Sequence, residues 1–436
     1  MKDQHGLEMS GAPDAVSAYD SAVGQLLRFE PAVEAGAEAA LALDPDCRMA
    51  RVLQAYLGLS SSEWPYARSA AKRLAGHDGL TTREKRHYQA ARRWAAGDWG
   101  GAGRHLDAIL EDHPMDALAL AMGHQIDFFL GDAGNLRGRV ERVCGRWDSD
   151  HPNFGFVEGM LAFGLEECGD YGAAEAAGRR AVAANPTDVW ANHAVAHVFE
   201  MQGRVDEGLA WLNLRRAQWS GDNFLAIHTA WHGALLALEQ EDYTSALAGY
   251  DNLIHPQDPS GTALALLDAA SLLWRLHLDG VDTEERFDIL AQDWSSKDPK
   301  PWYVFNDLHA VMAFVGAGRL ADAEAVIQRL DDFARDGDPA LTNHSMVTTA
   351  GLAAARGLLA FDREDYAGTV QAFAPVRHNL SIIGGSHAQR DAFQRTLLVA
   401  AQRSGDAVLA HQLAGERLAA RPTSAWTKAR LLGTPD

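Results

Sequence analysis

The sequence is poor in cysteine and has fewer basic than acidic residues. Its three cysteines (Cys47, Cys144 and Cys168) are odd in number and widely spaced, which excludes a disulfide framework and a zinc site of closely spaced cysteines. We expect buried free thiols in a reducing compartment. The 59 acidic residues outnumber the 39 basic ones and give a formal net charge of −20. Because such a chain repels phosphate backbones, nucleic acid is not expected as a partner.

Long apolar runs are also missing. No stretch reaches the roughly 18 apolar residues that a membrane-spanning helix needs, and the start of the chain lacks the apolar core of a secretory signal. We therefore expect a cytoplasmic protein without a membrane segment, and we expect residues 1–12 to be disordered. No alternating strand pattern appears, although 47% of the 436 residues are hydrophobic and provide ample material for a core.

A short turn motif recurs along most of the chain at intervals of 34 to 46 residues. Each copy follows one apolar-periodic segment and opens another, as in GDYGAA, GRVDEG and EDYTSA. The copies begin at Gly97, Gly131, Gly169, Gly203, Glu241, Gly280, Gly318, Glu364 and Gly405. Glycine at this place allows the left-handed backbone that ends a helix. Pro186 ends the second helix of one unit, and Thr187 or Asp188 can cap the next.

This spacing is typical of the helix-turn-helix unit of a tetratricopeptide repeat. The sequence therefore predicts an all-α fold, a superhelical solenoid of about nine or ten tetratricopeptide-like helical hairpins. Since no long linker divides the chain, we expect a single solenoid domain over residues 1–436.

Histidines gather in two short segments before successive turns. HAVAHVFE holds His193, His197 and Glu200, and HTAWH holds His228 and His232. Residues three or four apart share one face of a helix, so each segment is expected to present its histidines together. The first segment is not the HExxH motif of zinc proteases, because alanine follows its first histidine.

The distance of each polar residue from its own turn places several of them at one level. Positions nine or ten residues before the turn hold His193, His232, Ser271 and His309, and positions eleven to thirteen before it hold His228, Asp268 and Asp307. Because first helices stack side by side in a solenoid, we expect these residues to be lateral neighbours. The other single histidines have no such register and are expected at the surface or in turns: His77, His87, His105, His255 and His411.

Three interpretations of this polar band remain open. Imidazoles with carboxylates form a ligand set that suits Zn, Fe, Mn or Ni. The same groups also suit metal-free acid/base chemistry, because histidine titrates near neutrality and a carboxylate can orient it. Alternatively, the histidines are structural, or they line a groove that binds a peptide.

Further candidates lie outside the band. In GGSHAQRDAF, Ser386 is predicted to cap a helix, and Arg390 near the helix start needs a partner. That partner is either Asp391, another repeat, or the carboxylate of a substrate. His124 lies on an earlier first helix, and Trp231 is a candidate wall for a small-molecule site. A serine nucleophile is disfavoured, because Ser271 would lie inside a helix.

The runs NPTDVWANHAVAHVFEMQGR, HTAWHGALLALEQEDYTSALAGYDNLI, LLDAASLLWRLHLDGV, FNDLHAVMAF and GGSHAQRDAF occur in this order. Together they resemble the tetratricopeptide-repeat protein 38 family over nearly the whole chain. The resemblance implies a repeat solenoid but no particular reaction. It maps the family's motif positions to His124, His193, His197, Glu200, His228, His232, Asp268, Asn306, Asp307, His309, Gln389, Arg390 and Asp391. Position 387 departs from the family pattern, which can carry Asn where this chain has His387.

Our leading hypothesis is a small-molecule enzyme, a hydrolase or lyase that carries out an acid/base step with or without the help of a divalent metal such as Zn, Fe or Mn. The catalytic candidates are His193, His232, Asp268, Asp307 and Arg390. The candidate metal ligands are His193, His197, His228, His232 and Glu200. The candidate substrate-binding residues are His124, Trp231, Ser271, His309, Gln389 and Asp391. The alternative hypothesis is a non-catalytic repeat scaffold that binds a protein or peptide partner.

Overall fold

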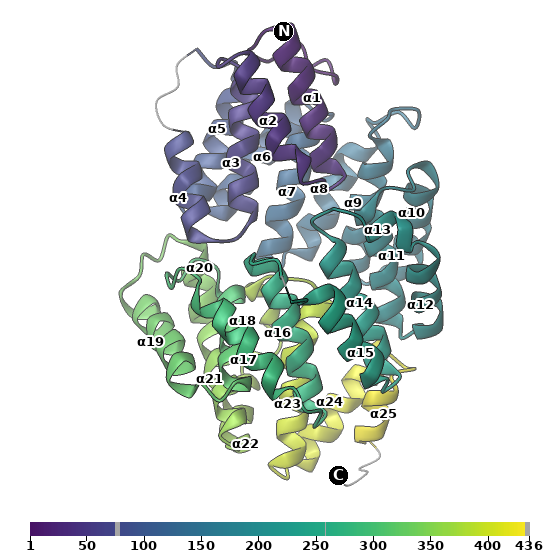
Figure 1. The fold of residues 1–436 in the computed structure, drawn as a ribbon, viewed down its shortest axis with the longest axis vertical. Helices are drawn as coiled ribbons and strands as arrows, with labels where there is room; N and C mark the ends of the chain where they lie inside the picture. Colours follow the sequence, from purple (N-terminus) through teal and green to yellow (C-terminus); the bar gives the residue numbers. More distant parts are fainter. Residues whose placement is uncertain (75–78, 258, 432–436) are drawn as a thin grey trace. The chain divides into compact units, whose positions relative to one another are not determined.

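The structure is a computed structural model that describes residues 1–74, 79–257 and 259–431; His77 lies outside these ranges. Within them the chain is helical, and the one strand-like feature is an isolated bridge between Lys2 and Glu8. The all-α fold class predicted from the sequence is therefore confirmed (Figure 1). In these ranges, no helix combines the length and the apolar character that crossing a membrane requires.

The helices up to the middle of the chain are α1 (Pro13–Leu27), α2 (Ala32–Leu43), α3 (Arg48–Ser60), α4 (Trp64–Arg73), α5 (Thr82–Ala95), α6 (Trp99–Asp112), α7 (Ala117–Leu130), α8 (Ala133–Cys144), α9 (Phe154–Glu167), α10 (Tyr171–Ala184), α11 (Val189–Gln202), α12 (Val205–Leu214) and α13 (Arg216–Trp219). The later helices are α14 (Ala226–Glu239), α15 (Tyr243–Gly249), η1 (Tyr250–Ile254), α16 (Ala263–Leu278), α17 (Glu284–Ser295), α18 (Val304–Gly316), α19 (Leu320–Asp336), α20 (Thr342–Met346), η2 (Val347–Gly351), α21 (Leu352–Asp362), α22 (Tyr366–Phe373), η3 (Leu380–Ile383), α23 (His387–Arg403), α24 (Ala407–Ala420) and α25 (Ala425–Leu431).

Helices that follow one another in the sequence pack together as hairpins. The pairs in contact include α1 with α2, α3 with α4, α5 with α6, α7 with α8, α9 with α10, α16 with α17, α18 with α19, α21 with α22, and α23 with α24. The first helices of successive hairpins also touch, as α16 does with α18. This arrangement is the tetratricopeptide-like repeat of helical hairpins that the sequence predicts.

The turns predicted from the repeat lie where the backbone becomes left-handed. Every turn residue from Gly97 to Gly405 in the predicted series has a positive φ, between 58° and 86°. Glu241 and Glu364 adopt this conformation without being glycine, each at φ 58°. The aspartate that follows each of them caps the next helix, since its carboxylate accepts a hydrogen bond from the backbone N–H three residues on.

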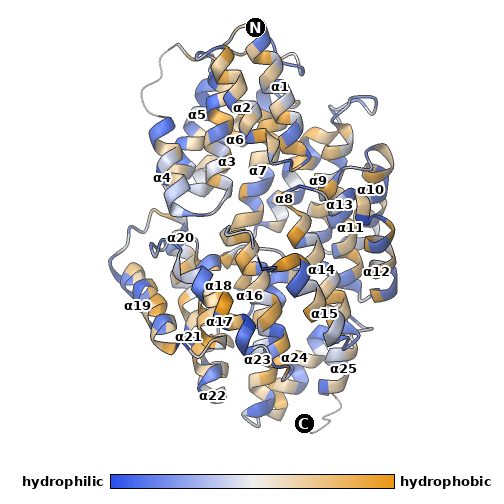
Figure 2. Ribbon diagram, viewed as in Figure 1, coloured by the Kyte–Doolittle hydropathy of each residue, from blue (hydrophilic) through white to orange (hydrophobic). Residues whose placement is uncertain are grey.

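First and second helices of a hairpin differ in how much surface they bury. In α17 the buried residues Phe287, Leu290, Ala291 and Trp294 fall at the helical spacing of a single face. Its partner α16 is buried along nearly its whole length and contacts α17, α18 and α23. Figure 2 shows hydrophobic and hydrophilic residues side by side along most of the helices. Polar side chains on the first helices are therefore held in a buried environment.

The chain divides into two compact units. Unit 1 contains Met1–Val195, Ala217–Ala226 and Ala340–Thr342, and unit 2 contains Ala196–Arg216, Ile227–Pro339 and Asn343–Asp436. Helix α11 is shared, so the histidines of HAVAHVFE belong to different units.

The first twelve residues, for which the sequence predicts disorder, make specific contacts within unit 1. Asp3 forms an ion pair of 2.9 Å with Arg83. The backbone N–H of Ser10 donates to Glu84 at 2.7 Å. The side chain of Met9 is buried.

The three cysteines are free, but only one of them fits the prediction of buried thiols. Cys47 is buried, whereas Cys144 is partly exposed and Cys168 is exposed. The latter two lie at the ends of α8 and α9, where the chain leaves the packed part of a hairpin. The ends of helices are more exposed than their middles. The hydrophobic pattern around Cys144 and Cys168 does not show where these helices end.

Candidate functional site

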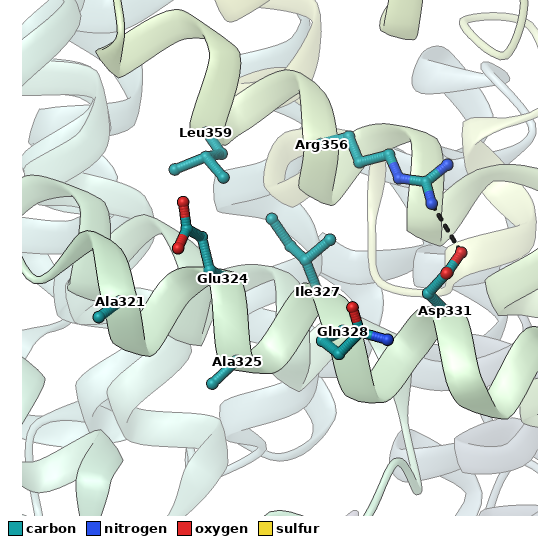
Figure 3. Close-up of a pocket in the computed structure, with 8 residues that line it drawn as sticks. All are labelled: Ala321, Glu324, Ala325, Ile327, Gln328, Asp331, Arg356 and Leu359. Carbon is teal, nitrogen blue, oxygen red and sulfur yellow. Dashed lines mark hydrogen bonds and ion pairs between the residues drawn. The ribbon is translucent and has the colours of Figure 1, made fainter.

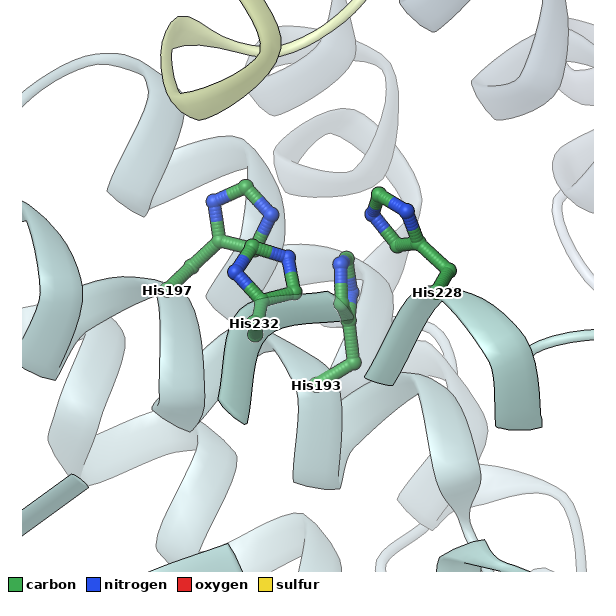
Figure 4. A group of neighbouring side chains, drawn as sticks. All are labelled: His193, His197, His228 and His232. Atoms are coloured by element: carbon green, nitrogen blue, oxygen red, sulfur yellow. The ribbon is translucent and has the colours of Figure 1, made fainter. Parts of the chain in front are cut away.

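Three histidines of unit 2 lie close together and form what we call the three-histidine cluster. His197 comes from α11, and His228 and His232 come from α14. The ring centroids of His197 and His232 are 4.2 Å apart, those of His228 and His232 are 4.9 Å apart, and those of His197 and His228 are 6.4 Å apart. Each ring offers one nitrogen, and these atoms lie within 4.8 Å of one another. Figure 4 shows the three rings with His193, which precedes His197 by one turn of α11.

Two buried carboxylates bind to rings of the cluster. Nδ1 of His232 lies 2.6 Å from Oε2 of Glu200, and Nδ1 of His228 lies 2.8 Å from Oδ2 of Asp268. Glu200 and Asp268 are only 3% and 2% exposed. An ionised carboxylate only accepts hydrogen bonds, so each ring directs a proton on Nδ1 toward its carboxylate. In the neutral ring, Nε2 then keeps its lone pair.

The helices explain how these groups meet. Glu200 follows His197 by three residues on α11, so one face of this helix presents both an imidazole and a carboxylate. His228 and His232 are four residues apart on α14. Asp268 comes from α16. The site is therefore assembled from three first helices of the repeat.

A fourth helix supports Asp268 through its N-terminus. Ser386 and Gln389 form a capping box at the start of α23, and the cap at Ser386 agrees with the sequence prediction. The side-chain nitrogen of Gln389 also lies 3.5 Å from Oδ1 of Asp268. Gly385 brings the preceding turn close to α18, since a Cβ at this position would lie 2.5 Å from the ring of Phe305.

The protonation state of His232 suits a metal ligand. Its side chain is completely buried. Burial, together with the neighbouring His197, His228 and Arg275, lowers the pKa of His232 well below its usual range. The ring is therefore neutral near pH 7, which is the form of imidazole that binds a metal ion.

An aromatic and a cationic side chain flank the cluster. The indole of Trp231 stacks on the ring of His228, with centroids 5.2 Å apart and an interplanar angle of 16°. The guanidinium carbon of Arg275 lies 5.3 Å from the centroid of Trp231. Arg275 donates to the carbonyl oxygen of Ser271 at 2.8 Å and also to its hydroxyl group. The Ser271 side chain therefore anchors this arginine.

The polar residues of GGSHAQRDAF are bound within the protein. Arg390 donates to the carbonyl oxygen of Gly384 at 3.1 Å, in the turn that precedes its own helix. Asp391 accepts hydrogen bonds from Nε of Arg395 at 3.0 Å and from Nη1 of Arg417 at 2.5 Å. Both side chains thus hold α23 in place.

The two candidates on α18 are His309, which bonds to its own helix, and Asp307, and burial shifts the pKa of both. Nδ1 of His309 donates to the carbonyl oxygen of Phe305 at 2.7 Å. Burial lowers the pKa of His309 to about 4, so its ring is neutral near pH 7. Burial also raises the pKa of Asp307 to about 7. Asp307 is therefore only partly ionised near neutral pH.

His124 and His193 share an aromatic cluster in unit 1. The ring of His124 lies 5.6 Å from Trp190 and 6.0 Å from Phe163. The ring of His193 lies 5.0 Å and 5.4 Å from the same two side chains. Burial, with a smaller effect of Arg139, lowers the pKa of His124 to about 3.

Sequence reasoning missed Arg421, which lies near the end of the chain. Its Nη2 is 4.0 Å from Oε1 of Glu200, and its Nη1 is 3.8 Å from Oδ2 of Asp391. A signal for this segment was present, because RPTSAW repeats the pattern of NPTDVW that opens α11. The repeat therefore continues through α25, and the last hairpin reaches the carboxylate that binds His232.

Of the single histidines predicted to lie at the surface or in turns, His87 was wrongly placed, whereas His255 does lie in the bend that follows η1. His87 is completely buried, with Nε2 3.0 Å from Asp116 and Nδ1 3.2 Å from the hydroxyl group of Tyr56. It falls on the buried face of α5. His255 is 7% exposed and lies 2.8 Å from Asp293. Both are polar core residues whose hydrogen-bond partners come from distant parts of the sequence.

A surface cavity of about 550 Å³ lies between α19 and α21 of unit 2. Figure 3 shows its lining, which consists of Ala321, Glu324, Ala325, Ile327, Gln328, Asp331, Arg356 and Leu359. Arg356 crosses one side of it and donates to Asp331 at 2.6 Å.

Comparison with known proteins leaves the family open. No family model matches the chain. A solved structure, described as "Crystal structure of APC/C hetero-tetramer Cut9-Hcn1", is similar over 90% of this chain and 78% of that chain, with 12% sequence identity and a TM-score of 0.40. This similarity is too low to support an inference about function. The resemblance to the tetratricopeptide-repeat protein 38 family therefore stays a prediction.

Proposed function

We propose that this chain is a helical-repeat protein that binds a divalent transition metal at the three-histidine cluster and uses it in an acid/base step on a small molecule. The observation that carries the proposal is the pair of Nδ1–carboxylate contacts, His232 with Glu200 at 2.6 Å and His228 with Asp268 at 2.8 Å. In metalloproteins, a ligating histidine commonly donates its second ring proton to a carboxylate, which fixes the ring and strengthens the ligand.

The spacing of the nitrogen atoms suits a metal ion. Imidazole nitrogens bound tetrahedrally at about 2.0–2.1 Å are about 3.4 Å apart. The ligand atoms of His197, His228 and His232 already lie within 4.8 Å of one another. Small side-chain rotations therefore bring all three nitrogens to one ion. His193, one turn before His197 on α11, belongs to unit 1 and is not counted among these ligands.

The composition of the cluster favours Zn, with Fe and Mn as alternatives. Three imidazoles form the ligand set of catalytic zinc sites, which keep one coordination position open. An open position is where a small molecule would bind, and a metal there would polarise it for hydrolysis. Asp307 and Arg390 remain candidates for a catalytic role. Activity measurements on variants of these two residues would test that role.

Metal content tests the proposal directly. Protein prepared with added Zn²⁺ and then desalted is expected to retain about one equivalent by elemental analysis. The variants His197→Ala and His232→Ala are expected to retain less than about a tenth of an equivalent. His277→Ala is the matched control, because His277 lies on α16 outside the cluster. Circular dichroism would show that all three variants are folded, and a metal-free wild-type protein would refute the proposal.

A second candidate function is a repeat scaffold that binds a protein. The cavity between α19 and α21 is the surface hollow at which such a partner would bind (Figure 3). Ala325→Arg would fill this cavity. If the scaffold hypothesis is correct, this variant loses a binding partner that His232→Ala retains. The opposite pattern would assign the partner to the histidine cluster.

A further inference from the structure

The last helix that the structure describes, α25, and the turn before it touch the ends of three other helices of unit 2. We call this segment, residues 421–431, the clasp. The hydroxyl group of Thr423 donates to the carbonyl oxygen of Gly203 at 2.9 Å, just after the end of α11. The hydroxyl group of Ser424 donates to Oε2 of Glu239, the last residue of α14, at 2.9 Å. The clasp is thereby bound to α11 and α14.

The third contact of the clasp is made by its tryptophan. Nε1 of Trp426 donates to Oδ1 of Asp279 at 2.6 Å, just after the end of α16, and Arg430 donates to the same oxygen at 2.8 Å. The guanidinium carbons of Arg395 and Arg417 lie 4.3 Å and 5.2 Å from the centroid of this indole. Hydrogen bonds and cation–π contacts therefore fasten the clasp to α16.

The helices that the clasp joins, α11, α14 and α16, are those that carry the three-histidine cluster and its two carboxylates. The clasp also reaches the cluster directly, because Nη2 of Arg421 is 4.0 Å from Oε1 of Glu200. The other oxygen of this carboxylate, Oε2, lies 2.6 Å from Nδ1 of His232. A single carboxylate therefore connects the clasp to a proposed metal ligand.

The composition of the clasp suits a segment that opens while the rest of the unit stays folded. Helix α25 has seven residues, about two turns, and a helix of this length is not stable alone in water. Within residues 421–431 the buried hydrophobic residue is Trp426, and the other buried residues are the polar Arg421, Ser424 and Thr427. Segments with few buried apolar contacts open locally at a small cost in free energy.

We infer that the clasp regulates the three-histidine cluster: it closes on the three helix ends when a metal ion is bound, and its opening lets the ion leave. The inference rests on the proposed function, since it concerns the same centre. Coordination of His232 makes the proton on Nδ1 more acidic and strengthens its hydrogen bond to Glu200, which favours the orientation that turns Oε1 toward Arg421. Linkage then requires that a closed clasp raises the affinity for the metal by the same factor by which the metal favours closure.

Hydrogen exchange of the native protein with and without Zn²⁺ tests this inference. The backbone amides of residues 425–431 are expected to exchange at least about fivefold more slowly when Zn²⁺ is bound, as for two coupled sites. Helix α22 is the internal control, because it is also short and packs on α21 and α23, which supply no histidine of the cluster. Its exchange rate is expected to stay the same. Equal slowing in both helices, or no slowing in the clasp, would overturn the inference.

A variant that displaces the clasp tests the reverse direction. A Cβ at Gly203 would overlap the hydroxyl oxygen of Thr423, so Gly203→Asn pushes the clasp away from α11. Asparagine tolerates the left-handed backbone at this position, where φ is 67°. Gly318→Asn is the matched control, because φ there is 65° and a Cβ would meet nothing within 4 Å.

Competition with a chelating dye measures the affinity of both variants for Zn²⁺. Gly203→Asn is expected to bind Zn²⁺ more weakly by the factor found in the exchange experiment, and Gly318→Asn is expected to bind it as the native protein does. Native affinity in Gly203→Asn would overturn the coupling. If this variant does not fold, the exchange of the native protein decides. A native protein that retains no Zn²⁺ overturns the proposed function and this inference with it, whereas one that retains Zn²⁺ with an unchanged clasp overturns only this inference.

Discussion

Nδ1 of His232 lies 2.6 Å from Oε2 of Glu200, a contact that joins α14 to α11 across 32 residues of sequence. Both side chains are buried. The carboxylate therefore fixes the orientation of the ring and the position of its proton. The contact makes Glu200 the residue through which the cluster is most easily weakened without removing a ligand.

Glu200→Gln is expected to lower the affinity for Zn²⁺ by about 10- to 100-fold, because the amide oxygen accepts the same hydrogen bond without the negative charge. Competition with a chelating dye measures this affinity. Glu207→Gln is the matched control on α12, the second helix of the same hairpin, since Glu207 is exposed and pairs with Arg204. An unchanged affinity in Glu200→Gln would show that the carboxylate does not support a metal ligand.

Metal binding is also expected to stabilise the fold. A ligand that binds only the folded state, present at about 100 times its Kd, adds about 2.7 kcal/mol to the free energy of unfolding. Thermal unfolding with and without Zn²⁺ measures the effect, and a chelator is expected to reverse it. His232→Ala is expected to unfold at the same temperature in both conditions. A metal-induced shift that persists in this variant would place the ion elsewhere.

The repeat could be predicted well from the sequence, because its signals are local. The left-handed turns at Gly169 and Glu241 follow from the chemistry of a single turn, and the cap at Ser386 follows from the spacing to Gln389. The distance of a residue from its own turn is also a local signal. Residues at the same distance from their turns lie at one level of the repeat, on adjacent first helices. This signal brought His232 and Asp268 into the same band.

The detailed pairing could not be predicted, because it depends on how neighbouring helices rotate. The count from the turns put His232 level with His193, but it did not show that the ring of His232 meets His197 and Glu200. Arg421 escaped notice because nothing near it in the sequence indicates a carboxylate more than two hundred residues earlier. His87 was misjudged for the same reason, as its partner Asp116 lies on the next hairpin.

The left-handed glutamates offer a test of the turns. Glu364→Gly is expected to stabilise the protein by about 0.5–1 kcal/mol. The reason is that the strain of a side chain at φ 58° costs more free energy than the extra backbone entropy that glycine loses on folding. Gly405→Ala is the reciprocal variant and is expected to destabilise by about 1 kcal/mol, since φ there is 80°. Urea unfolding measures both, and a destabilised Glu364→Gly would contradict the strain at this turn.

The ion pairs of Asp391 are expected to dominate the stability of the last hairpins. Asp391→Ala leaves the buried Arg395 and Arg417 without this partner, which should cost about 3–5 kcal/mol. Asp332→Ala removes an exposed partner of Arg335 on α19 and should cost far less, because water screens this pair. Similar losses in the two variants would mean that burial does not set the strength of these pairs.

Asp188 is expected to make stability depend on pH. It is completely buried at the start of α11, and one of its oxygens accepts from the backbone N–H of Ala191 at 2.9 Å. Burial raises its pKa to about 7, while an aspartate in the unfolded chain titrates near about 3.9. Between these two values the folded protein holds the extra proton, so this residue's contribution is fully present below about pH 4 and is lost as the pH rises to about 7.

Asp188→Asn removes that loss while keeping the helix cap, because asparagine caps as well as aspartate. The free energy of unfolding of the variant, relative to wild type, is therefore expected to rise by on the order of a few kcal/mol between about pH 4 and pH 7. Urea titrations at several pH values measure this difference, with the exposed Asp206→Asn as control. A difference that stays constant over this range would mean that Asp188 is ionised in the folded protein, and the buried carboxyl would then need a cation that compensates it.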